Sequence, residues 1–271
     1  MGSTAARTPT RLAILEADTP VPNANAKYHG YRGVFTDLFR RAVAPGPLEG
    51  HLAITGYDVV NEPDSYPDLE SVDAVLISGS KHSAYLDDEW IVKLVAFTRK
   101  ALATNGRVKV VGVCFGHQIV GRALGVKVDR NHKGWEVSVT EVKLSETGRA
   151  VFGSDTLVVR FSSLNNAVSQ KIHQMHRDIV FSNPEGAHNL GENDICANQG
   201  FLLPGKAITV QGHPEFTGEI ISEILELRHD TKLFTDDVYS SGVNRANIDH
   251  DGVMIAQAFL RFIQGQEAIK A

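Results

Sequence analysis

The chain has 271 residues, of which 42% are hydrophobic and 22% charged, a composition typical of soluble globular proteins. Its net charge of −5, without a long basic run, argues against nucleic acid or a membrane surface as a partner, and no stretch is apolar enough to span a bilayer. We expect one domain over residues 1–271, with a core at about 10–230 and a C-terminal helical segment at 231–271. Only two cysteines and no signal-like segment indicate a reducing, cytoplasmic location.

The first part of the chain alternates apolar runs with helical patterns. Strands are predicted at residues 11–16, 51–60 and 74–77, and Val34 and Leu38 mark a helix that ends before Pro45. Residues 17–30 are polar and contain proline, which predicts a loop over the C-terminal edge of the sheet. Alternating strands and helices indicate an α/β fold with a parallel sheet, flavodoxin-like in outline.

Ser78, Gly79 and Ser80 directly follow the strand at 74–77. Taken alone they form a plain Gly/Ser turn. Residues 81–88 should then form a loop, with Asp87 or Asp88 capping a helix that carries Trp90.

Residues 108–125 combine a β-branched run with a helical pattern. The run predicts a strand buried on both faces, and the turn to the helix contains Gly112, Cys114 and Gly116. This spacing is that of a nucleophile elbow, G-x-Ser-x-G, with cysteine in place of serine. A thiol there would sit at a helix N-terminus, which favours the thiolate, and the N–H of Phe115 would point toward an oxyanion. The pattern alone leaves a second interpretation open, because most free cysteines are small buried hydrophobic residues.

Residues 126–159 become richer in alternating residues, and Val137, Val139 and Val142 predict antiparallel strands added at a sheet edge. Three nearby histidines suggest a metal site, but no carboxylate or thiolate completes a ligand spacing, so polar loop histidines are the favoured interpretation: His173, His176 and His188. Cys196 is interpreted as structural. A final helix over residues 253–262 is expected to pack on the sheet.

Residues 207–216 form another β-branched run that ends at Gly212 and is followed by His213, Pro214 and Glu215. Catalytic groups of open α/β sheets lie at the C-terminal ends of strands. Glu215 could accept a hydrogen bond from the His213 imidazole and fix its tautomer. Alternatively, His213 is a surface turn residue and Glu215 a carboxylate stabilised by a helix N-terminus.

These two segments together resemble the signatures of class I glutamine amidotransferase domains, in residues 112–118 (GVCFGHQ) and 213–215 (HPE). Further similarities are Ser78-Gly79-Ser80 with Trp90, residues 134–137 (GWEV) and residues 176–178 (HRD). The resemblance implies a flavodoxin-like three-layer sandwich with a mostly parallel central sheet and added antiparallel edge strands. It also implies a catalytic triad of Cys114, His213 and Glu215.

The same resemblance assigns the oxyanion hole to the backbone of Gly79, Ser80 and Phe115, although Ser80 replaces a glycine of the family pattern. It assigns substrate binding to Gln118, Trp135 and His176. The Cys114 thiolate would attack a side-chain amide, and His213 would protonate the leaving amine. This chemistry needs no metal or organic cofactor.

The leaving amine is a separate question. Gly212 replaces the bulky residue common before His-Pro-Glu, and residues 114–119 (CFGHQI), 211–215 (QGHPE) and 78–94 resemble a free-standing branch that includes plant γ-glutamyl peptidases. We therefore expect hydrolysis of a γ-glutamyl amide, with Gly212 opening space beside the nucleophile for a larger leaving group. Two alternatives stay open: a glutaminase subunit that delivers ammonia to a synthetase partner, and a non-catalytic relative that binds a metabolite or partner.

Overall fold

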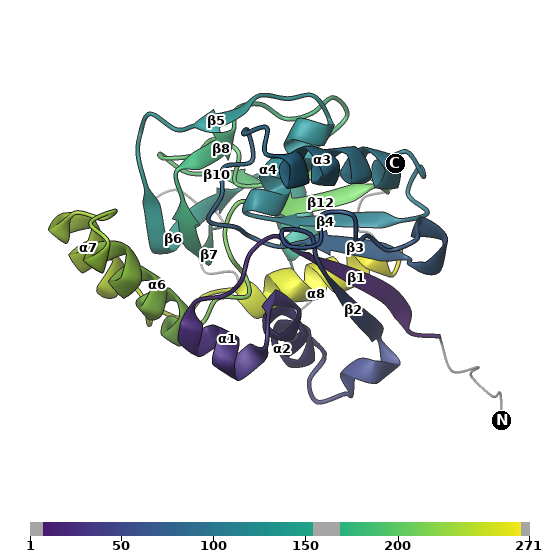
Figure 1. The fold of residues 1–271 in the computed structure, drawn as a ribbon, viewed down its shortest axis with the longest axis horizontal. Coiled ribbons are helices and arrows are strands. Elements are labelled where there is room, and N and C mark those ends of the chain that lie inside the picture. Colours follow the sequence, from purple (N-terminus) through teal and green to yellow (C-terminus); the bar gives the residue numbers. More distant parts are fainter. Residues whose placement is uncertain (1–7, 154–168, 267–271) are drawn as a thin grey trace.

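The computed structural model describes residues 8–153 and 169–266, and its centre is a seven-stranded sheet (Figure 1). Five strands run parallel, in the order β2 (Leu52–Asp58), β1 (Thr10–Glu16), β3 (Ala74–Ile77), β4 (Lys109–Val113) and β12 (Ala207–Val210). The sheet continues with two short antiparallel strands, β11 (Phe201–Leu203) and β9 (His188–Asn189). The order of the parallel strands is that of flavodoxin-like folds, as the sequence predicted.

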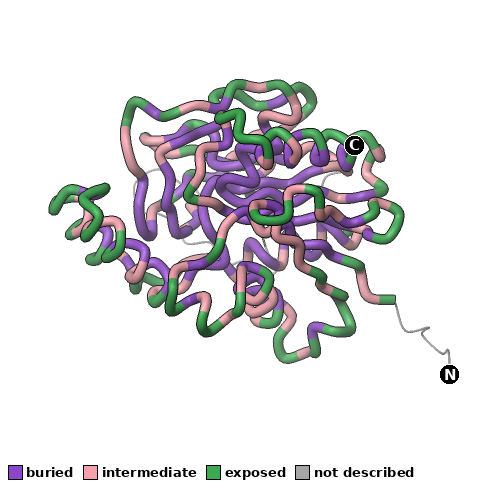
Figure 2. The backbone as a smooth tube through the Cα atoms, in the orientation of Figure 1, coloured by how far each residue is buried: buried purple, intermediate pink, exposed green. Residues whose placement is uncertain are grey.

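Helices cover both faces of this sheet and make it the middle layer of three (Figure 1). On one face lie α2 (Tyr31–Val43) and α8 (Gly252–Ile263), and on the other lie α3 (Glu89–Leu102) and α4 (Phe115–Ala123). The central strands are buried from both sides, as the purple tube in Figure 2 shows. This double burial explains why residues 74–77 and 110–113 are apolar without alternation.

A second, antiparallel sheet lies beside the central one and holds the alternating residues. It consists of β6 (Glu136–Leu144), β7 (Ser169–His176) and β10 (Gly191–Glu192). Val137, Val139 and Val142 lie in an antiparallel strand, as predicted, but this strand pairs with β7 and does not extend the edge of the central sheet. The edge is formed by β11 and β9, and a further small ladder joins β5 (Val128–Arg130) to β8 (Asp178–Val180). The last part of the predicted alternating region, residues 154–159, lies outside the described residues.

The structure also differs from the sequence-based expectation at residues 17–30 and at the start of α3. Residues 17–30 contain a short helix, α1 (Pro22–Tyr28), which begins with proline at a position where its missing N–H costs nothing. Asp88 is the N-cap residue of α3, but its side chain makes no capping hydrogen bond. Asp87 instead forms an ion pair with Arg122 of α4.

The remaining helices are peripheral. They are α5 (Glu146–Phe152), α6 (Gly218–Asp230), α7 (Asp236–Val243) and two 3-10 turns at Leu48–Gly50 and Leu69–Ser71. The predicted C-terminal helix is α8, and its Ile255, Phe259 and Phe262 are buried. Within residues 8–153 and 169–266, no helix combines the length and hydropathy needed to cross a bilayer.

Candidate functional site

Cys114 occupies a strained turn between β4 and α4. Its backbone has φ 51° and ψ −102°, a positive φ that non-glycine residues rarely adopt. The turn requires its two glycines, since a Cβ on Gly112 would lie 2.7 Å from the carbonyl of Gly116, and one on Gly116 would clash with the carbonyl of Ile77. The sequence therefore builds the nucleophile-elbow geometry, with the cysteine at the N-cap of α4 and 4% exposed.

His213 and Glu215 lie next to this turn because β12 runs parallel to β4, with Val210 opposite Val113. The Nδ1 atom of His213 is 2.8 Å from Oε1 of Glu215, and both side chains are buried. Two further contacts hold His213 in place. Phe216 stacks on the imidazole at 3.9 Å between ring centroids, and the backbone N–H of His213 donates to the His173 carbonyl at 2.7 Å. Neither residue is on the surface, so the interpretation of His213 as a surface turn residue is wrong.

The electrostatic surroundings favour a charged imidazole. Burial lowers the pKa of His213, but the Cys114 and Glu215 side chains interact with the imidazolium and together raise this pKa to about 10. A cysteine and a carboxylate placed on the same histidine thus produce a cationic proton donor at neutral pH. By contrast, burial lowers the pKa of His117 on α4 to about 3, so that this histidine is neutral.

Three backbone amides of the elbow and of the turn at residues 78–80 have no partners of their own among the described residues. The N–H groups of Gly79, Ser80 and Phe115 have no hydrogen-bond acceptor among the described residues. Gly79 is packed against the imidazole, since a Cβ there would lie 2.6 Å from Cε1 of His213. Ser80 does not have a positive φ, so the serine fits at this position without backbone strain.

Ser78 organises this segment from inside the protein. Its hydroxyl accepts a hydrogen bond from the Ala17 N–H at 2.9 Å and donates one to the Gly79 carbonyl at 3.0 Å. Asp18, which follows Ala17 in the chain, accepts hydrogen bonds from the backbone N–H of Lys81 at 2.7 Å and from the Lys81 ammonium group at 2.8 Å. These contacts tie residues 78–81 to the end of β1 and leave the amides of Gly79 and Ser80 free.

Gln118 does not face an open pocket. Its amide nitrogen donates to the Asp178 carbonyl at 2.8 Å and to Oε1 of Gln211 at 3.2 Å. Gln211 in turn lies 3.6 Å from the Cys114 sulfur, as a donor to it. Gln118 is therefore linked to the cysteine through Gln211. Gln211 belongs to the QGHPE segment, but the sequence alone did not predict a role for its side chain.

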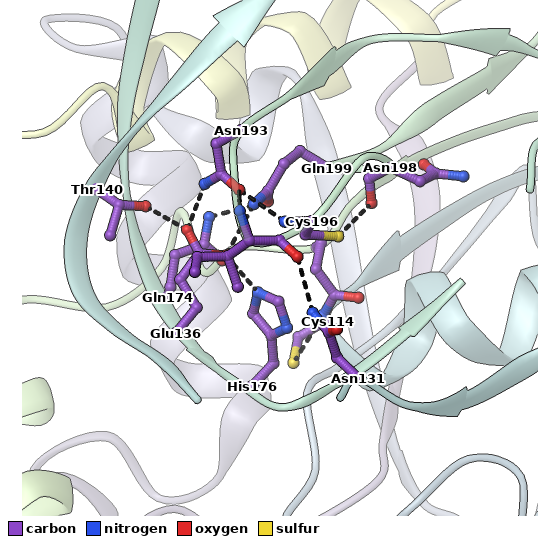
Figure 3. Close-up of polar contacts among 12 residues, drawn as sticks. Cys114, Asn131, Glu136, Thr140, Gln174, His176, Asn193, Cys196, Asn198 and Gln199 are labelled. Atoms are coloured by element: carbon purple, nitrogen blue, oxygen red, sulfur yellow. Dashed lines mark hydrogen bonds and ion pairs between the residues drawn. The ribbon is translucent and has the colours of Figure 1, made fainter. Parts of the chain in front are cut away.

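His176 belongs to a buried polar network centred on Glu136 (Figure 3). The Nε2 atom of His176 is 3.1 Å from one carboxylate oxygen of Glu136, which also accepts from Gln199 at 2.9 Å. The other oxygen accepts from Thr140 and Asn193. Burial would raise the pKa of Glu136, but these hydrogen bonds outweigh it and hold the pKa below its usual value. His176 is thus 3% exposed, and its ring is held within this network.

Trp135 packs against two arginines: Arg177, which belongs to the HRD segment, and Arg228, for which the sequence gives no signal. The guanidinium of Arg177 is 4.9 Å from one ring centroid of Trp135, and that of Arg228 is 5.0 Å away. Phe234 packs edge-on against the same indole at 5.1 Å. Arg228 stands on α6, where its sequence pattern is that of an ordinary helix surface residue, so only the structure brings it into this group.

Gly212 has a packing role that differs from the expected one. A Cβ at this position would lie 2.7 Å from Cδ1 of Ile172 and 2.9 Å from the His173 carbonyl. The interpretation that Gly212 opens space beside the nucleophile is therefore wrong, because its missing side chain points at strand β7. The glycine instead allows β7 and the end of β12 to approach each other.

The other histidines and the second cysteine do not form a metal site. Among residues 8–153 and 169–266, no three or more His, Cys, Asp or Glu side chains are grouped so that they could hold a metal ion. His173 packs against His250, whereas His188 lies on the exposed strand β9. Cys196 is buried with its thiol 3.2 Å from the Asn198 carbonyl, and burial raises its pKa to about 12.

Known proteins resemble this chain over nearly its whole length. The sequence model of the family described as glutamine amidotransferase class-I matches residues 50–228. A glutamine amidotransferase-like protein of Schizosaccharomyces pombe is 35% identical over 255 residues, which cover 93% of this chain and 98% of that protein. Gamma-glutamyl peptidase 5 of Arabidopsis thaliana is 35% identical over 237 residues, 84% of each chain. The fold is similar to the crystal structure of a glutamine amidotransferase from Thermotoga maritima, with a TM-score of 0.69 at 18% identity, covering 95% of this chain and 100% of that one.

Proposed function

The chain belongs to the class I glutamine amidotransferase family, and on this premise we propose that it is a cysteine hydrolase that cleaves γ-glutamyl amide bonds. The observation that carries the proposal is the contact of 2.8 Å between His213 and Glu215 beside a cysteine held at φ 51°. A structural cysteine would need neither the strained elbow nor a buried, charged histidine next to it.

The first half of the reaction forms a thioester. The sulfur of Cys114 attacks the γ-carbonyl carbon, and the oxygen that becomes negative is stabilised by the N–H of Phe115 and by those of Gly79 and Ser80. The C–N bond then breaks as the His213 imidazolium gives its proton to the leaving amine. Glu215 holds Nδ1 of the ring, so that Nε2 carries the proton that is transferred.

The second half releases the γ-glutamyl group. The now neutral His213 accepts a proton from water, and the resulting hydroxide attacks the thioester carbonyl. The C–S bond breaks, the glutamyl γ-carboxylic acid leaves, and Cys114 and His213 return to their starting charges. Each turnover consumes one water and produces one amine and one glutamate group.

The substrate class is proposed from the relatives. Several relatives at 28% to 35% identity, over 75% to 84% of this chain, are gamma-glutamyl peptidases of Arabidopsis thaliana. We propose that the leaving amine is that of an amino acid, peptide or conjugate rather than ammonia alone.

The test is the product profile of the purified chain, with Cys114→Ala as the control. We expect glutamate release from γ-glutamyl peptides that is at least as fast as from glutamine and absent in the variant. Slow release from glutamine alone, increased by a co-purified synthetase, would replace the peptidase proposal with that of an ammonia-supplying subunit. An intact Cys114 that reacts with no γ-glutamyl compound would indicate a binding protein.

A further inference from the structure

Arg228 on α6 is a partly buried cation for which the residues that the structure describes supply no counterion. Its guanidinium packs at 5.0 Å from Trp135 and 5.7 Å from Phe234, both measured to ring centroids. The Nη1 atom is fully buried and has no hydrogen-bond partner. Within residues 8–153 and 169–266, no carboxylate lies within ion-pair distance of Arg228, and no acceptor hydrogen-bonds to the N–H groups of its guanidinium.

A guanidinium with buried, unpaired N–H donors is suited to bind an anionic ligand. Buried guanidinium donors without acceptors are costly, and planar carboxylates satisfy them with two parallel hydrogen bonds. The aromatic faces of Trp135 and Phe234 fix the orientation of the guanidinium in advance, so that less entropy is lost on binding. Arg177 lies against the same indole and adds a second positive charge nearby.

Two segments connect Arg228 to the site: its helix α6 begins at Gly218, three residues after Glu215, and Trp135 directly precedes Glu136, whose polar network is drawn together with Cys114 in Figure 3. Burial lowers the pKa of Arg228, while electrostatic interactions with Cys114, Tyr31 and Asp18 raise it. Burial raises the pKa of Tyr31. Electrostatic interactions with Glu215 and Cys114 raise this pKa further, whereas Arg228 lowers it. Arg228 thus belongs to the ionisable side chains around the thiol and His213, the residue that gives its proton to the leaving amine.

We propose that Arg228 binds a free carboxylate on the leaving group, so that the preferred substrates are γ-glutamyl peptides with a C-terminal carboxylate. The inference rests on the proposed hydrolase function and adds the chemical class of the leaving group. Glutamine and simple γ-glutamyl amines lack this carboxylate and would leave the Arg228 donors unsatisfied.

The test compares acid and amide forms of the same substrate, namely γ-glutamylalanine and γ-glutamylcysteinylglycine with their C-terminal amides. Each pair has the same glutamyl group and differs only in the terminal charge. For at least one pair we expect kcat/KM to favour the acid by about 10- to 100-fold, as for a charge-assisted hydrogen bond. Arg228→Gln should remove this preference through KM, and Arg228→Lys should restore part of it because it keeps the charge without the fork.

A matched control is Arg99→Gln, which makes the same change in charge at an exposed arginine of α3 and should leave the acid preference intact. Equal hydrolysis of acid and amide by the wild type, or a preference that survives Arg228→Gln, would overturn the inference while the hydrolase proposal stands. An equal loss for acid, amide and glutamine would place Arg228 at the glutamyl carboxylate instead and also overturn it.

Binding separates this inference from the proposed chemistry. In the Cys114→Ala background, calorimetry with the same acids and amides measures affinity without turnover. Tighter binding of the acid, lost on adding Arg228→Gln, supports the carboxylate site even if the wild type cleaves nothing, an outcome that would refute only the hydrolase. Equal affinities for acid and amide refute the site.

Discussion

Glu215 meets His213 with one carboxylate oxygen, at 2.8 Å from Nδ1, while its other oxygen is buried and has no hydrogen-bond partner. Among the described residues the carboxylate therefore has a single polar contact, which is to the imidazole. A buried carboxylate with so little other support is costly unless it stabilises a neighbouring positive charge. The relationship indicates that Glu215 is placed for the charged state of His213.

Glu215→Gln should separate the charge of this residue from its size. The amide keeps the packing but removes a group that raises the pKa of His213, which lies at about 10. Because the imidazolium form donates the proton, activity should fall as pH rises through this pKa, and the variant should begin to fall at lower pH. We also expect kcat/KM to drop on the order of 10³- to 10⁴-fold, as for loss of a triad carboxylate. A pH–rate profile measures both effects, and an unmoved alkaline limb would contradict the assigned contact.

The two cysteines should differ sharply toward alkylating reagents. Burial raises the pKa of Cys196 to about 12, so it stays a thiol at pH 8, whereas Cys114 sits at a helix N-terminus beside a cationic histidine. Mass spectrometry after iodoacetamide treatment of the folded protein should find one adduct, at Cys114. Cys114→Ala should remain unlabelled, and labelling of Cys196 at a similar rate would contradict the packing around it.

The Ser-Gly-Ser turn provides a pair of variants with opposite expectations. Gly79→Ala places a Cβ 2.6 Å from Cε1 of His213, so the imidazole must move and activity should fall about 100-fold, the usual cost of a displacement near 1 Å. Ser80→Gly keeps the backbone N–H and should change kcat by less than about threefold if the donor is the backbone amide. Steady-state kinetics with melting temperatures as a folding check would decide. A large loss in Ser80→Gly alone would assign a role to its hydroxyl instead.

The sequence predicts the elements that depend on local pattern. Strand β3 is found at Ala74–Ile77 as predicted. The elbow at Cys114 follows from Gly112 and Gly116, because the turn has no room for a Cβ at either position. Helix α1 is missed because only Ala24 of its seven residues is buried, so that it has no apolar periodicity to detect.

Long-range contacts explain the remaining differences. The alternation of β6 predicts a strand but does not identify its partner, which is β7 and begins 25 residues after β6 ends. Arg228 likewise has no local signal, because its role depends on Trp135, which packs against it from a segment more than 90 residues earlier in the chain. The same holds for Gly212, whose meaning depends on Ile172 of β7 rather than on its neighbours in the motif.

Gly212→Ala tests the packing role of that glycine. A methyl group would lie 2.7 Å from Cδ1 of Ile172, so the strands must separate, and overpacking of this kind costs about 1–3 kcal/mol. Urea unfolding should show this loss of stability, and the double variant with Ile172→Val, which removes the clashing Cδ1 atom, should recover part of it. The ratio of kcat/KM for γ-glutamylalanine and glutamine should stay unchanged, because the methyl group points at β7 and not at the leaving group. A variant that is as stable as the wild type but discriminates against the larger substrate would return Gly212 to the wall of the substrate site.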